Sequence, residues 1–127
     1  MKFLALACIL LVCPRARAAI LFMDLNSSQS EVAAAQKAAD ERGEELVVLS
    51  GEEGQDMGQA LGEQLSEMEK EGQELGTFII SGHYDGNSFH GGTGRITPEG
   101  VQQGFKKHKQ ARAQGRSALL WGCYSAR

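Results

Sequence analysis

The chain has 127 residues, of which 42% are hydrophobic and 23% charged, and it contains 16 glycines but only two prolines. This composition fits one folded domain of ordinary size. It excludes a disordered tail, a collagen-like repeat and a disulfide-rich scaffold.

The amino-terminal segment has the pattern of a secretory signal. Lys2 precedes an apolar run over residues 3–13, and Ala16, Arg17 and Ala18 form a small-x-small cleavage pattern. The run is far shorter than the roughly 20 residues of a membrane-spanning helix. We therefore expect residues 1–18 to be a signal peptide, residues 19–127 to be one exported domain, and no transmembrane span. The alternative is a buried first strand or helix over residues 1–12.

Removal of the signal would leave Cys123 as the only cysteine, because the other two are Cys8 and Cys13. No internal disulfide could then form. An unpaired cysteine in an exported protein is an intermolecular partner, a buried small hydrophobic residue or a reactive nucleophile. Composition alone leaves these three roles open.

Charge is divided along the chain. Residues 31–74 carry 13 acidic and three basic side chains, whereas residues 95–127 carry one acidic and seven basic ones. The basic run around Lys106, Lys107 and Lys109 has no aromatic residues within it, and the whole chain has a net charge of −3. This pattern is typical of a solvated helix face and not of a nucleic-acid-binding surface. We expect His108 to lie on the same polar face, and no nucleic-acid partner.

Four apolar runs predict strands, and they cover residues 19–25, 45–49, 77–81 and 118–121. A helix is expected between the first two runs. It would begin at Ser28 with a capping box, in which the Ser28 hydroxyl and the Glu31 carboxylate each accept from the other residue's backbone N–H, and end at Gly43.

Two further helices are expected. The second has one apolar face at helical spacing, made of Met57, Leu61, Leu65 and Met68. The third begins with Thr97 as cap and Pro98 at the first helical position, and it ends near Gly115. Val101 and Phe105 are its buried residues.

The alternation of strands and helices sets the fold class. The strands show little internal polar alternation, which is typical of a parallel sheet covered on both faces. The sequence therefore predicts a single α/β domain with a mostly parallel sheet of about four strands and helices on both faces.

The segment between the third strand and the third helix is rich in glycine. Five of the 13 residues from 82 to 94 are glycines, and they stand together with His83, Asp85 and His90. Such density indicates tight turns or close backbone approach. Gly91 and Gly92 predict the turn of a small hairpin joining residues 87–90 to 93–96, with His90 near its tip. The spacing of a phosphate-binding loop is absent.

Two residues able to perform nucleophilic chemistry follow consecutive predicted strands. His83 follows the third strand and Cys123 the fourth. Ligands of open parallel sheets bind at the carboxyl ends of the strands, and neighbouring strands are roughly 4.8 Å apart. If these strands are neighbours, the imidazole can activate the thiol as a nucleophile. The alternative is a packing cysteine and a surface histidine.

The residues at the ends of the third and fourth predicted strands form a distinctive pattern. The third strand ends in Ser81-Gly82-His83-Tyr84-Asp85-Gly86, and the fourth ends in Trp121-Gly122-Cys123, with Cys123 40 residues after His83. This pattern resembles the caspase-like (clan CD) cysteine peptidases, which include clostripain, gingipain, legumain and the CHAT domains. The resemblance implies a caspase-like three-layer sandwich that cleaves a protein or peptide substrate, with no cofactor and no metal. It also implies that His83 is the general acid and base and that Cys123 is the nucleophile.

The chain departs from the family pattern at three places. Tyr84 stands where the family has glycine, so the candidate oxyanion-hole donors are the backbone N–H groups of Tyr84, Gly86 and Cys123. Gly122 replaces the usual alanine. The chain also ends at Arg127, whereas family domains continue through further strands. It therefore resembles the first, large-subunit-like part of such a domain, and we expect a second chain or a C-terminal half to cover the open sheet edge.

A third member of the site and two other functions stay open. Asp24, at the end of the first strand, or Asp85 is expected to orient His83. One alternative function is an inactive caspase-like binding or scaffold module that docks through residues 28–71 or 97–113. The other is a zinc-binding hydrolase that uses His83, Asp85, His90 and Cys123 as ligands.

Overall fold

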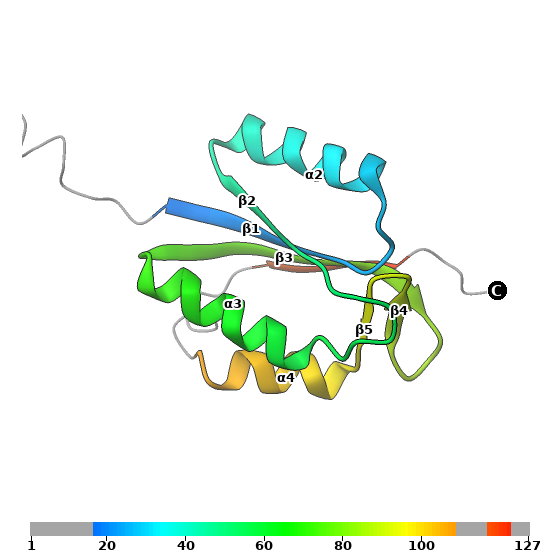
Figure 1. Cartoon of the computed structure of the whole chain (residues 1–127). Helices are drawn as coiled ribbons and strands as arrows, with labels where there is room; N and C mark the ends of the chain where they lie inside the picture. The colour runs from blue at the N-terminus through cyan, green and yellow to red at the C-terminus, as the bar shows by residue number, and fades with distance from the viewer. Residues whose placement is uncertain (1–16, 109–116, 123–127) are drawn as a thin grey trace, which may run out of the picture.

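The computed structural model describes residues 17–108 and 117–122 of the chain (Figure 1). In chain order the elements are β1 (Arg17–Asp24), α2 (Gln29–Arg42), β2 (Glu45–Leu49), α3 (Gly58–Lys70), β3 (Gln73–Tyr84), β4 (Phe89–Gly91), β5 (Gly94–Ile96), α4 (Pro98–Lys106) and β6 (Ser117–Gly122). The predicted α/β class is confirmed, and each of the four predicted strands is present.

The sheet is mixed. Four strands run parallel in the order β2-β1-β3-β6, and the hairpin of β4 and β5 adds antiparallel pairing at the carboxyl end of β3. Figure 1 shows α2 over one face of the sheet and α3 with α4 over the other. The two faces bury separate apolar clusters. Ile20, Phe22 and Ile79 pack beneath α2, while Leu21, Met23 and Ile80 belong to the larger cluster that includes α3.

Helix α2 begins and ends where the sequence predicts. The Ser28 hydroxyl accepts from the backbone N–H of Glu31 at 3.3 Å, and the helix stops at Gly43, whose φ of 67° is in the left-handed region. The other half of the predicted capping box is wrong. The Glu31 carboxylate accepts from the Ser81 hydroxyl instead, and the Ser28 N–H lies 3.4 Å from Asp24 Oδ1.

Helices α3 and α4 lie against each other on the same face of the sheet (Figure 1). The predicted apolar face of α3 is confirmed, because Met57, Leu61, Leu65 and Met68 are all buried. At the start of α4, the Thr97 hydroxyl accepts from the backbone N–H of Gly100 at 3.0 Å, as expected of an N-cap.

Helix α4 is shorter than predicted. It ends at Lys106 and not near Gly115, and residues 109–116 lie outside the described part of the chain. The backbone N–H of His108 donates to the Phe105 carbonyl at 3.0 Å, which closes a tighter turn than the helical one. His108 was expected on a polar face, and this is wrong: it is 8% exposed, with Nδ1 3.0 Å from Glu69 Oε1 of α3.

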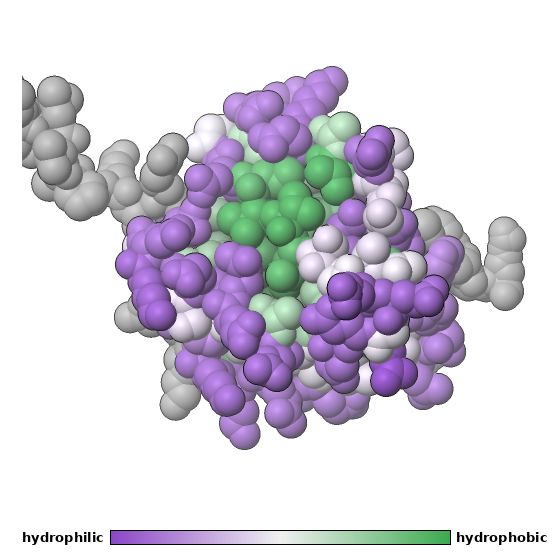
Figure 2. All heavy atoms as spheres, viewed as in Figure 1, coloured by the Kyte–Doolittle hydropathy of each residue, from purple (hydrophilic) through white to green (hydrophobic). Residues whose placement is uncertain are grey.

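Strand β2 forms one edge of the sheet, and apolar surface remains there. Figure 2 shows an apolar patch over β2, between the polar surfaces of α2 and α3. Val48 is 43% exposed, and Leu46, Val47 and Leu49 are half-buried. Within residues 17–108 and 117–122, no helix has the length and hydrophobicity needed to cross a membrane.

The predicted signal peptide falls almost entirely on residues 1–16, which lie outside the described residues. Its last two residues belong to β1, where Arg17 pairs with Gln73 and Ala18 with Glu74. Cleavage after Ala18 would therefore shorten β1 by two residues and leave the pairing from Ala19 onward in place.

Candidate functional site

The predicted site lies at the carboxyl ends of β3 and β6. These strands are parallel neighbours, and their register pairs Ser81 with Trp121 and Gly82 with Gly122. The adjacency on which the predicted dyad depends is thus present, and His83 directly follows Gly82. Cys123, with its predicted roles as nucleophile and oxyanion donor, lies outside the described residues.

The glycine-rich segment forms the predicted hairpin. β4 and β5 are antiparallel, with Phe89 opposite Ile96 and Gly91 opposite Gly94, so the turn is one residue later than predicted. Sequence reasoning missed that β4 also pairs with β3. The signal for this pairing was the cluster of turn-forming residues between Tyr84 and Phe89, because such a cluster after a strand is typical of a hairpin.

The hairpin is fixed to the end of β1. The Thr93 N–H donates to the Leu25 carbonyl at 3.0 Å, and the Thr93 hydroxyl donates to the Asp24 carbonyl at 2.8 Å. Gly91 passes so close to the Leu25 carbonyl that a Cβ at this position would overlap it. Glycine at position 91 therefore allows the close backbone approach that holds the hairpin beside the predicted site.

Pairing between β3 and β4 brings two histidines together. His83 and His90 are direct register partners, and their ring centroids are 5.8 Å apart with an angle of 39° between the ring planes. His83 is exposed and His90 is half-buried. The imidazole predicted to act as general base therefore has a second imidazole beside it on the adjacent strand.

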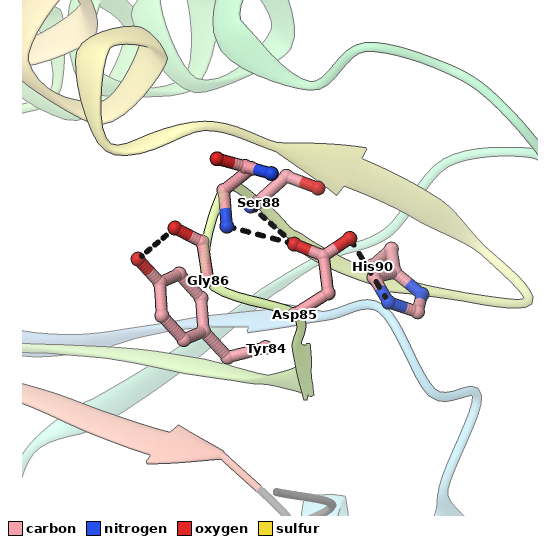
Figure 3. A network of polar contacts seen from close by, with 6 residues as sticks. Tyr84, Asp85, Gly86, Ser88 and His90 are labelled. Atoms are coloured by element: carbon pink, nitrogen blue, oxygen red, sulfur yellow. Dashed lines mark hydrogen bonds and ion pairs between the residues drawn. The ribbon is translucent and has the colours of Figure 1, made fainter.

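Asp85 organises the loop between these strands (Figure 3). Its Oδ1 accepts from the backbone N–H groups of Asn87 at 2.8 Å and Ser88 at 2.9 Å, and its Oδ2 lies 3.8 Å from His90 Nε2. The hydrogen bonds from Ser88 and Asn87 lower the pKa of Asp85 below its ordinary value of 3.8, and the nearby His90 adds to this. Asp85 is therefore a carboxylate near neutral pH.

Asp24 is 6% exposed and caps its own loop. Its Oδ1 accepts from the backbone N–H of Asn26 at 3.1 Å and lies 3.4 Å from that of Ser28. Among the described residues, neither Asp24 nor Asp85 forms a hydrogen bond with His83. Their predicted role in orienting His83 stays a prediction.

Tyr84 and Gly86, the two predicted oxyanion donors within the described part, lie in or beside the same loop. The Tyr84 ring packs on Phe89 with centroids 4.7 Å apart, and its hydroxyl donates to the Gly86 carbonyl at 3.0 Å (Figure 3). Gly86 has a φ of 96°, a conformation that favours glycine. The Tyr84 side chain thus holds the loop in place through these two contacts.

A partly buried polar cluster beneath the start of α2 was missed by sequence reasoning. Ser81 is fully buried, its hydroxyl donates to the Glu31 carboxylate, and it accepts from Asn26 Nδ2 at 3.1 Å. A serine at the end of an otherwise apolar strand was the signal. The cluster links α2 to β3 two residues before His83.

A polar groove of about 860 Å³ lies between α3 and α4, and residues such as Glu63, Glu99 and Gln103 line it. It contains none of the predicted site residues. Within the described residues, no three or more His, Cys, Asp or Glu side chains are grouped to hold a metal ion. The predicted zinc set includes Cys123 and is therefore only partly covered by the structure.

No protein-family model matches the chain, and no curated protein is significantly similar to it in sequence.

Proposed function

We propose that this protein is an exported, caspase-like cysteine peptidase that cleaves peptide bonds with a dyad of Cys123 and His83. The arrangement of its parallel strands supports the proposal. β3 and β6 are adjacent parallel strands, and helices cover both faces of the sheet, as the resemblance to caspase-like peptidases implies.

The observation that carries the proposal is the register between Gly82 and Gly122. If the parallel pairing continues by one residue, His83 and Cys123 follow it side by side, on strands roughly 4.8 Å apart. At that separation an imidazole nitrogen and a thiol can come within hydrogen-bond distance. His83 is exposed, so a substrate can reach it.

The proposed reaction has two halves. His83 accepts the thiol proton, the Cys123 thiolate attacks the peptide carbonyl carbon, and the C–N bond breaks as His83 gives the proton to the leaving amine. Water then attacks the thioester and gives a proton to His83, and the C–S bond breaks to release the acid as His83 returns this proton to the Cys123 sulfur. Backbone N–H groups of Tyr84, Gly86 or Cys123 stabilise the oxyanion in both halves.

The open side of β6 belongs to the same proposal. Within the described residues β6 pairs only with β3, so its other edge has backbone groups without a strand partner. Such an edge accepts a further strand. A second chain or a C-terminal half would complete the sheet here and shape the pocket for the substrate.

The activity can be tested on a mixture of peptides in which every residue type occurs before a peptide bond that could be cleaved. Mass spectrometry would follow new peptide ends produced by the full chain, by Cys123→Ser and by His83→Ala. We expect cleavage by the unmodified chain and loss of cleavage in both variants. Cleavage that persists in Cys123→Ser would exclude the proposed nucleophile. No cleavage by any chain, together with a Cys123 that reacts only as a free thiol, would favour the inactive binding module.

A further inference from the structure

We propose that His83 and His90 together bind a divalent transition-metal ion such as zinc. The two residues face each other across the antiparallel pairing of β3 and β4, and neither side chain is fully buried. Neutral imidazole is a common ligand for zinc, copper and nickel. The hairpin fixes both backbones, so the two rings are already held near each other before an ion arrives.

The ring spacing fits one shared ion. Zinc binds imidazole nitrogen at about 2.0–2.1 Å in a tetrahedral arrangement, which places the centres of two ligating rings roughly 5–5.5 Å apart. The His83 and His90 centroids are 5.8 Å apart. Because both side chains are partly exposed, small rotations of the rings can close the difference.

Asp85 adds the charge and orientation that such a site requires. Its carboxylate Oδ2 lies 3.8 Å from His90 Nε2. A carboxylate beside the second nitrogen of a ligating imidazole selects its tautomer and strengthens metal binding. The Asp85 carboxylate beside Nε2 favours the proton of His90 on that nitrogen. Nδ1 then keeps the lone pair that binds the ion, and water completes the coordination.

The ion would also regulate the site, and this part rests on the proposed function. A metal bound to His83 occupies the nitrogen lone pair that accepts the Cys123 proton. Metal binding would therefore inhibit the thiol reversibly.

Zinc titration by calorimetry tests the site without any activity. The full chain would carry serine at all three cysteine positions, so that Cys8, Cys13 and Cys123 cannot bind the ion. We expect one equivalent at neutral pH, at least about tenfold weaker binding in His90→Ala and in His83→Ala, and weaker binding in Asp85→Asn. His108→Ala is the matched control and should bind as before. No binding, or equal binding in His90→Ala, would overturn the site.

A second measurement separates the site from the proposed function. Zinc should slow alkylation of Cys123 in the unmodified chain, and His90→Ala should weaken this inhibition while His83 remains available. Zinc binding without any effect on Cys123 would support the metal site and contradict the dyad. If the chain binds no zinc but Cys123 still requires His83 for its reactivity, the result would support the dyad and overturn the metal site.

Discussion

Gly82 of β3 and Gly122 of β6 are paired in register at the carboxyl ends of two adjacent parallel strands. His83 follows the first of them, and β4 places His90 opposite it. The sheet therefore gathers an exposed imidazole, a second imidazole and the ionised Asp85 at one edge. Both proposals, the Cys123–His83 dyad and the metal site, follow from this arrangement.

The contact between α3 and α4 depends on the absence of a side chain at Gly104. A Cβ there would lie 2.8 Å from Leu61 Cδ2, whereas a Cβ at Gly62 of α3 would meet nothing within 4 Å. We predict that Gly104→Ala lowers the free energy of unfolding by about 1–3 kcal/mol. Gly62→Ala should raise it by roughly 0.5–1 kcal/mol, because alanine favours a helix interior. Urea unfolding followed by circular dichroism measures both, and equal effects would contradict the packing described.

The pair of His108 and Glu69 joins the end of α4 to α3. Because His108 is buried and its Nδ1 is 3.0 Å from Glu69 Oε1, removal of either side chain leaves a polar group with a lost partner. We predict that His108→Ala lowers the free energy of unfolding by about 1–3 kcal/mol. The exposed Lys106→Ala should change it by less than about 0.5 kcal/mol. A double-mutant cycle of His108→Ala and Glu69→Gln measures the coupling energy between the two side chains. Absence of coupling would show that the contact does not form.

The loop between β3 and β4 should respond to acid through Asp85. The folded-state pKa of Asp85 is lowered by hydrogen bonds from Ser88 and Asn87, so its charged form stabilises the fold above pH 3.8. This stabilisation is lost as the pH falls through the lowered folded pKa. We predict that the amide resonances of Asn87 and Ser88 titrate with a midpoint below 3.8. In Asp85→Asn this titration should vanish, and a midpoint above 3.8 would contradict the hydrogen bonding.

Local signals in the sequence predicted most of the fold. The four apolar runs became β1, β2, β3 and β6, and the caps at Ser28, Gly43 and Thr97 became helix ends. These features depend on neighbours a few residues away, so the sequence alone carries them. The adjacency of β3 and β6 was left as a condition by the sequence, and the structure supplies it.

Contacts between distant segments were the part that the sequence did not reveal. Glu31 bonds to Ser81, 50 residues away, instead of closing its own capping box. His108 is buried because α3 supplies Glu69. The pairing of His90 with His83 likewise depends on β4 folding back onto β3. In each case a tertiary partner determines the role of a polar side chain.

Reactivity of Cys123 as a function of pH tests the central claim most directly. The rate of alkylation by iodoacetamide would be resolved for the Cys123 peptide by mass spectrometry, which separates it from Cys8 and Cys13. A free thiol titrates near about pH 8.5, and an imidazole partner lowers this value by up to several units. We predict reaction at acidic pH in the unmodified chain and in His108→Ala, and a return to free-thiol behaviour in His83→Ala. A midpoint near 8.5 in all three proteins would contradict the dyad.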